Sequence, residues 1–79
     1  MNTLPDRKEN PNGLYSRYTV AKKEGHTDPN AEYFVLRLDD GGSDPAHIAA
    51  CRKAVLKYAD EIEAHRPKLA TDIRARYAP

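Results

Sequence analysis

The sequence predicts an α+β domain with the order β-β-α-α, in which an antiparallel two-stranded sheet packs on a long helix and a shorter C-terminal helix. Two segments rich in Tyr, Thr, Val and Phe come first, and two segments whose apolar residues recur at helical spacing follow them. Stretches containing glycine or proline separate each segment from the next. Because an isolated two-stranded ribbon is weak, we expect oligomerisation to extend the sheet.

The length and composition indicate one small domain. The chain has 79 residues, of which 39% are hydrophobic and 32% charged. A domain of this size buries only about 60–65% of its unfolded surface, so a homo-oligomer is a common remedy for the small core. We expect a flexible arm over residues 1–13, which are polar and rich in turn formers, and a single domain over residues 14–79.

The two predicted strands are Leu14–Lys22 and Glu32–Leu38, joined by a loop with turn signals at Gly25 and Asp28-Pro29-Asn30. In the second strand, one face is fully apolar and should pack on the helix: Phe34, Leu36 and Leu38. The opposite face is only half apolar and consists of Tyr33, Val35 and Arg37. We expect something to cover it, either a second subunit, a ligand or the N-terminal arm.

The first helix is predicted from about Pro45 to about Ala64, with Asp44 as its N-cap and Pro45 at its first position. Its apolar stripe consists of Ile48, Cys51, Val55, Tyr58, Ala59 and Ile62. His65-Arg66-Pro67 should end this helix, and Pro67 should open the shorter one. The apolar face of the shorter helix consists of Leu69, Ala70, Ile73 and Tyr77.

Four residues on the outer sheet face form the first candidate site: Tyr15, Arg17, Tyr33 and Arg37. Arginine binds phosphate or carboxylate groups in a bidentate manner, and tyrosine rings can stack on a base. The same residue types are enriched at protein interfaces, so a dimer contact is the other interpretation. Both hold if the ligand site is shared between subunits.

The loop Gly41-Gly42-Ser43, at the start of the first helix, forms a second candidate ligand-binding set. Backbone N–H groups and the positive end of the helix dipole can hold an anion there. Three carboxylates oppose this interpretation, since Asp39, Asp40 and Asp44 would repel an anion. A plain turn followed by an N-cap is therefore the competing interpretation.

Other chemistry is predicted to be absent. A calcium-type site from Asp39, Asp40, Asp44 and His47 does not match an EF-hand, and a lone cysteine argues against zinc, so we expect no metal and no cofactor. Cys51 lies on the apolar stripe, where a thiol packs rather than reacts. No nucleophile has a recognisable base beside it, so we predict that the protein is not an enzyme.

Charge and targeting signals also limit the partners. The net charge is +1, and acidic neighbours separate the basic side chains of the two helices, so nucleic acid is not expected as a partner. These basic side chains are Lys53, Lys57, Arg66, Lys68, Arg74 and Arg76. No apolar run is long enough to span a bilayer, and the N-terminus lacks the apolar core of a signal peptide. With one cysteine, these features predict a cytoplasmic protein without a membrane partner.

One combination of short motifs resembles a known group. Residues 32–39 read Glu-Tyr-Phe-Val-Leu-Arg-Leu-Asp, Asp44-Pro45-Ala46 follows, then an Ala-rich helix with Lys57-Tyr58-Ala59, and then Pro67-Lys68-Leu69-Ala70. This looks like a group of small phage- and prophage-encoded proteins of uncharacterised function, over about residues 15–77. The resemblance implies a phage context, hence the host cytoplasm and an anti-defence role, and it brings no activity or site residues.

From these observations we predict a non-enzymatic binding protein that sequesters a small anionic or nucleotide-type ligand in a site shared between subunits. The alternative is a protein–protein interaction module that inhibits or adapts a host macromolecule. In that case the Tyr/Val sheet face or the basic helix face would make the contact.

Overall fold

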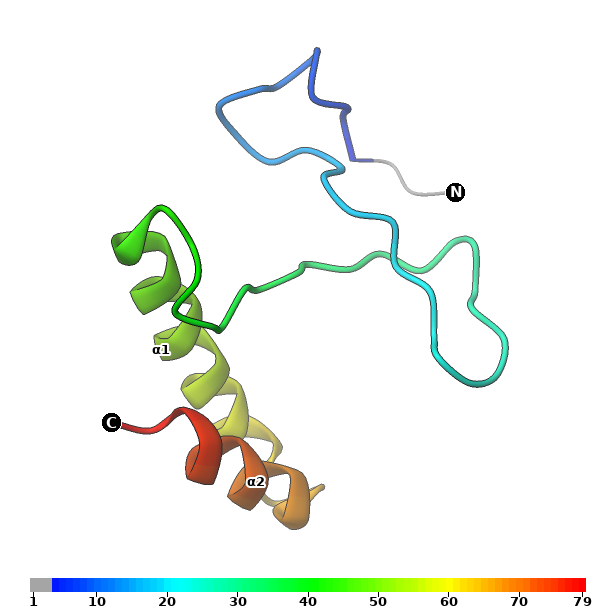
Figure 1. The fold of residues 1–79 in the computed structure, drawn as a ribbon. Coiled ribbons are helices and arrows are strands. Elements are labelled where there is room, and N and C mark those ends of the chain that lie inside the picture. The colour runs from blue at the N-terminus through cyan, green and yellow to red at the C-terminus, as the bar shows by residue number, and fades with distance from the viewer. Residues whose placement is uncertain (1–3) are drawn as a thin grey trace. The chain divides into compact units, whose positions relative to one another are not determined.

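A computed structural model describes residues 4–79 of the chain, and within that range it contains two α-helices and no β-strand (Figure 1). Helix α1 spans Pro45–Ile62 and helix α2 spans Pro67–Tyr77. The chain divides into two compact units, one ending at Val35 and the other running from Leu36 to Pro79. Both helices belong to the second unit.

The predicted α+β class is wrong, because neither Leu14–Lys22 nor Glu32–Leu38 forms a strand in the described chain. High β-propensity describes residues that suit a pleated, half-buried surface, and it produces a strand only where a partner and a covering layer exist. The apolar stripe of α1 is instead covered by α2 and, in part, by the loop before α1. The apolar surface of α1 that was predicted to pack against a sheet is therefore buried within the second unit.

Helix α1 begins as the sequence predicts. The Asp44 side chain accepts a hydrogen bond from the His47 N–H at 3.2 Å, and Pro45 occupies the first turn. These two features satisfy or remove N–H groups that have no partner within the helix. The helix ends at Ile62, whose carbonyl accepts hydrogen bonds from the N–H groups of His65 and Arg66.

Helix α2 follows after a short turn and starts with Pro67, as expected for a proline at a helix N-terminus. Arg66 stands at the N-cap position and makes no side-chain capping bond. Arg74 and Arg76 lie in the last turn, where positive charge suits the helix dipole. The helix is therefore supported at its C-terminal end and by packing rather than by an N-terminal cap.

The core of the hairpin lies between the two helices. Ala59 of α1 and Ala70 of α2 have no exposed surface, and Ile73 is buried beside them. Larger side chains pack around these three residues: Val55, Leu56, Ile62, Leu69 and Tyr77. Small residues at the centre let two helices approach closely, and the larger side chains fill the space around them.

The predicted stripe of α1 is confirmed except at one position. Ile48, Cys51 and Ala59 are buried, and Val55 and Ile62 are half-buried. Tyr58 is 46% exposed, so its inclusion in the core stripe is wrong. The face of α2 is confirmed, since Ala70 and Ile73 are buried and Leu69 and Tyr77 pack against them.

Arg74 joins the two helices by charge. Its guanidinium donates to the Asp60 carboxylate at 2.8 Å and to the Glu63 carboxylate, both near the end of α1. These two acceptors raise the pKa of Arg74, with Asp60 the larger cause. The pairs are exposed, so they contribute mainly to orientation of the helices.

From residue 4 to Val35, the first unit is made of turns and irregular chain. The Ser16 N–H donates to the Pro5 carbonyl at 2.7 Å, and the Lys22 N–H donates to Thr27 Oγ1 at 2.7 Å. Gly25 lies in the turn between Lys22 and Thr27 and has φ of 83°, a conformation that favours glycine. Residues 1–3 of the predicted arm lie outside the described chain, and the proposed boundary between arm and domain at residue 14 stays a prediction.

Candidate functional site

The predicted site residues fall into two local groups rather than one sheet face. Tyr15, Arg17 and Tyr33 belong to the unit that ends at Val35, whereas Arg37 and the Gly41-Gly42-Ser43 loop belong to the unit that starts at Leu36. The sheet that was to bring Arg17 and Arg37 side by side is absent from residues 4–79. Ligand binding by these residues stays a prediction.

Arg17 and Tyr15 contact each other. The Arg17 Nε donates to the Tyr15 hydroxyl at 3.0 Å, and the Arg17 guanidinium carbon lies 5.3 Å from the Tyr15 ring centroid. A guanidinium over a tyrosine ring is a favourable cation–π arrangement. The pair is local, since only one residue separates its members.

Arg37 is engaged by a carboxylate of its own loop. Its Nε and one terminal nitrogen donate to Asp39 at 2.7 and 3.2 Å, and the Gly41 N–H donates to the same carboxylate at 3.1 Å. The pKa of Asp39 is lowered to about 2. The hydrogen bond from Arg37 is the largest cause, and the hydrogen bond from the Gly41 N–H is the next largest. The donors expected to bind an external anion therefore already hold an internal one.

The rest of the loop is shaped by the helix that follows it. A Cβ added to Gly42 would lie 3.2 Å from the Ile48 side chain, so the loop backbone passes close to α1 at this point. Asp44 caps the helix through the His47 N–H, and Ser43 is exposed. The second candidate set thus matches a tight turn and N-cap, with carboxylates on the N–H groups of both Gly41 and His47.

Arg52 is a structural residue that the sequence pattern did not reveal. Its Nε donates to the Leu38 carbonyl at 2.9 Å, and a terminal nitrogen pairs with Asp40 at 3.0 Å. These contacts fix the end of residues 32–38 and the start of the loop onto α1. No spacing rule connects Arg52 to Leu38, since the contact depends on how the loop folds back.

Cys51 is buried and packs as predicted, with only 3% of its surface exposed. Its Sγ lies 3.6 Å from His47 Nε2, one helical turn earlier. Within residues 4–79, no group of three histidine, cysteine or acidic side chains could hold a metal ion. We therefore assign the His47–Cys51 contact to the packing of α1.

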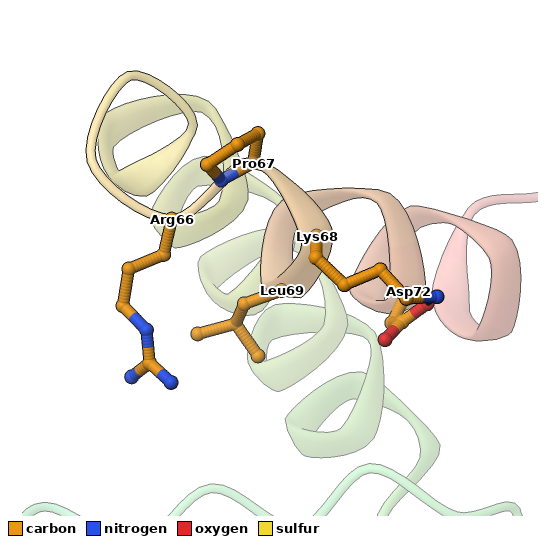
Figure 2. A pocket seen from close by; sticks show the side chains of 5 residues that line it. All are labelled: Arg66, Pro67, Lys68, Leu69 and Asp72. Atoms are coloured by element: carbon orange, nitrogen blue, oxygen red, sulfur yellow. Dashed lines mark hydrogen bonds and ion pairs between the residues drawn. The ribbon is translucent and has the colours of Figure 1, made fainter.

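A hollow of about 370 Å³ lies at the start of α2, lined by Arg66, Pro67, Lys68, Leu69 and Asp72 (Figure 2). Lys68 Nζ pairs with Asp72 Oδ1 at 2.8 Å, and this hydrogen bond is the main cause that raises the pKa of Lys68. Figure 2 shows Lys68 reaching along α2 to Asp72, whereas Arg66 extends away from both. Because the Lys68 charge is paired within α2, the hollow lacks the convergent unpaired groups typical of a ligand site.

Large apolar side chains are exposed in the part of the chain before α1. Phe34 is 73% exposed, and its neighbours Tyr33 and Val35 are each 40% exposed. Leu14 and Tyr18 are also exposed. The prediction that Phe34 packs on a helix is wrong, whereas Leu36 and Leu38 of the same face are half-buried.

The backbone around Phe34 also has unused hydrogen-bonding capacity. Within residues 4–79, no hydrogen bond involves the backbone N–H or C=O groups of residues 32–36. Figure 1 shows this stretch as an open trace without helix or arrow. Exposed aromatic side chains on an unpaired backbone are features of a segment that binds a protein.

Comparisons with known proteins found no matching family model, no similar curated protein and no similar solved structure. The resemblance to small phage-encoded proteins therefore stays a prediction. Neither helix of the described chain has the length and apolar character needed to cross a membrane.

Proposed function

We propose that the chain is a protein–protein interaction module, in which the helical hairpin is a folded carrier and residues 32–38 are the recognition segment. The single observation that carries this proposal is the exposure of Phe34, at 73%, between two other exposed apolar side chains. Contiguous exposed apolar groups are typical of interaction surfaces, and aromatic residues are enriched in the buried cores of interfaces.

The unpaired backbone of residues 32–36 favours a specific mode of binding. An extended peptide can add to the exposed edge of a strand in its partner, with main-chain hydrogen bonds supplying affinity and alternate side chains supplying specificity. The residue types support this mode, since Tyr, Phe and Val favour the pleated conformation. On binding, the segment forms main-chain hydrogen bonds with an extended segment of the partner.

The end of the segment is anchored, and this supports binding as well. The Leu38 carbonyl is held by Arg52, and Asp40 pairs with the same guanidinium. An anchored segment loses less conformational freedom on binding than an unattached peptide, so more of the contact energy appears as affinity.

The interaction module is favoured over sequestration of a small anion. The Arg37 guanidinium and the Gly41 N–H both donate hydrogen bonds to the Asp39 carboxylate. An external anion would therefore have to displace this carboxylate. Anion binding and the absence of enzymatic activity stay predictions.

A site-specific photo-crosslinker tests the proposal. The aromatic photoreactive analogue p-benzoyl-phenylalanine replaces Phe34 in the full chain, which is irradiated in a lysate of the cells that make the protein. We expect one dominant covalent adduct with a protein, identified by mass spectrometry. An excess of a peptide covering residues 30–40 should compete for the same partner and remove the adduct.

The matched control carries the same photoreactive group at Lys53, an exposed position on α1. If both positions label the same broad set of proteins, or if Phe34 gives no adduct, residues 32–38 are not a recognition segment. An adduct at Phe34 that the peptide does not reduce leads to the same conclusion.

A further inference from the structure

We infer that the partner of residues 32–38 is a second copy of this chain, paired antiparallel with Val35 opposite Val35. This inference rests on the proposed function, because it names the partner of the same recognition segment. The pairing is between chains, so it does not restore the two-stranded sheet that was predicted within one chain and is absent.

Symmetry limits the ways in which this segment can pair with itself. An antiparallel pair of identical segments is related by a two-fold axis perpendicular to the plane of the pair. The axis keeps each residue on the same face in both copies, and directly opposite residues also share a face. The axis must therefore pass beside one residue, which lies opposite its own copy.

With Val35 at the axis, the two pairs nearest the axis on each side are chemically complementary, whereas the outermost pair places Glu32 opposite Leu38. Tyr33 lies opposite Arg37 twice on the Val35 face, once on each side of the axis. Phe34 lies opposite Leu36 twice on the other face. Aromatic–aliphatic neighbours across strands stabilise a pair, and an arginine can stack on a tyrosine ring.

Neighbouring registers lose this complementarity. An axis at Phe34 places Arg37 opposite Ala31, and an axis at Leu36 places Arg37 opposite Val35. Only the Val35 register gives both arginines a tyrosine while keeping both phenylalanines against leucine. The segment is thus self-complementary in one register among these three.

The chain uses the arginine–tyrosine contact elsewhere. Arg17 lies over the Tyr15 ring at 5.3 Å, and Arg76 lies over the Tyr77 ring at 5.9 Å. The Arg37–Asp39 ion pair is compatible with the dimer, because residues two apart share one face of an extended segment. The paired Asp39 would then lie beside the tyrosine–arginine contact rather than compete with it.

Single cysteines test the register. In a Cys51→Ala background, Val35→Cys places two thiols directly opposite each other, at a backbone separation that a disulfide can span. Air oxidation should therefore convert this variant into a covalent dimer. The control Glu32→Cys places its two thiols about 20 Å apart along the pair, so it should remain monomeric on a non-reducing gel.

Sedimentation velocity tests the self-association itself, using the full chain at micromolar concentrations and above. The parent protein should form a dimer, and Phe34→Asp should weaken the dimer by about tenfold or more. Because Phe34 is 73% exposed, circular dichroism should show the same helix content in the variant and the parent. A parent protein that is monomeric at every concentration would overturn the inference, as would equal cross-linking of the two cysteine variants.

The photo-crosslinking experiment separates this failure from failure of the proposed function. A monomeric parent that still forms a competable Phe34 adduct with a different protein overturns self-pairing and supports the interaction module. A monomeric parent without any Phe34 adduct overturns both.

Discussion

Large apolar side chains are buried in the core of the helical hairpin but exposed at Tyr33, Phe34 and Val35 of the recognition segment. In the hairpin, Ile73 is 9% exposed and packs between α1 and α2, whereas Phe34 of the segment is 73% exposed. Both are large apolar residues in runs with a clear pattern. An apolar pattern therefore produces a buried element only where a second element covers it.

The largest effect should come from truncating the hairpin core. Ile73→Ala should lower the free energy of unfolding by about 2–4 kcal/mol, because it removes buried methylene groups and leaves a cavity. Urea denaturation followed by circular dichroism measures it. The matched control Phe34→Ala removes a larger side chain, yet it should change the stability by less than about 0.5 kcal/mol. Equal losses would show that Phe34 is part of the same folded core.

Overpacking the core between the helices should have the next largest effect. Ala59→Leu forces three extra carbon atoms into a site with no exposed surface, and it should cost about 1–3 kcal/mol. The same urea experiment measures it. The control Ala54→Leu lies on the exposed face of α1 and should be nearly neutral. If both variants are neutral, the two helices do not pack closely at Ala59.

Removing the cap of α1 should have a moderate effect. Asp44→Ala leaves the His47 N–H without its acceptor and should cost about 1 kcal/mol of stability. Hydrogen exchange at the first turn of α1 should become faster while exchange in α2 changes less. Asp44→Asn keeps an oxygen acceptor and should behave nearly as the parent. Equal effects of alanine and asparagine would mean that the negative charge, rather than the cap bond, matters.

The smallest effect concerns pH and the loop at the end of the recognition segment. The pKa of Asp39 is lowered from 3.8 to about 2, so the ionised form is favoured in the folded chain. Its stabilising contribution is therefore present above the unfolded pKa and is lost as the pH falls from about 4 towards 2. NMR titration of the Asp39 carboxyl carbon measures this shift.

Arg37→Gln should move the pKa of Asp39 back towards 3.8, because the hydrogen bond from Arg37 is the largest cause of the shift. Lys53→Gln removes one positive charge elsewhere and serves as the control. An unchanged Asp39 pKa in the Arg37 variant would mean that the Arg37–Asp39 pair does not persist in solution.

The sequence predicted the local features of the helices well. Asp44 and Pro45 mark the start of α1, Pro67 marks the start of α2, and the spacing of Leu69, Ala70, Ile73 and Tyr77 gives the buried face. These signals act within one turn of helix, so they can be read along the chain. Lys57 and Glu61, four residues apart on α1, also form an ion pair at 3.0 Å, which is a contact of the same local kind.

The sequence predicted the segment 32–38 poorly. Its alternation was consistent with a strand, but a strand needs hydrogen-bonding neighbours and a covering layer that no local pattern specifies. The prediction that Tyr58 is buried was wrong for a related reason, since its spacing fits the α1 stripe but α2 does not cover it. The candidate site residues belong to two separate units, and the sheet predicted to bring them together is absent from residues 4–79.

The two helices, the cap of α1 and the break at Pro67 could be predicted from the sequence alone, because each depends on interactions between residues close in the chain. That Cys51 is buried became clear only from the folded chain. The tertiary structure decided which partner each apolar face received. Helix α2 packs on the apolar stripe of α1, and Arg52 holds the Leu38 carbonyl by a hydrogen bond. The Asp39 carboxylate accepts hydrogen bonds from Arg37 and from the Gly41 N–H. Those choices depend on competition among surfaces for burial, which only the folded chain resolves.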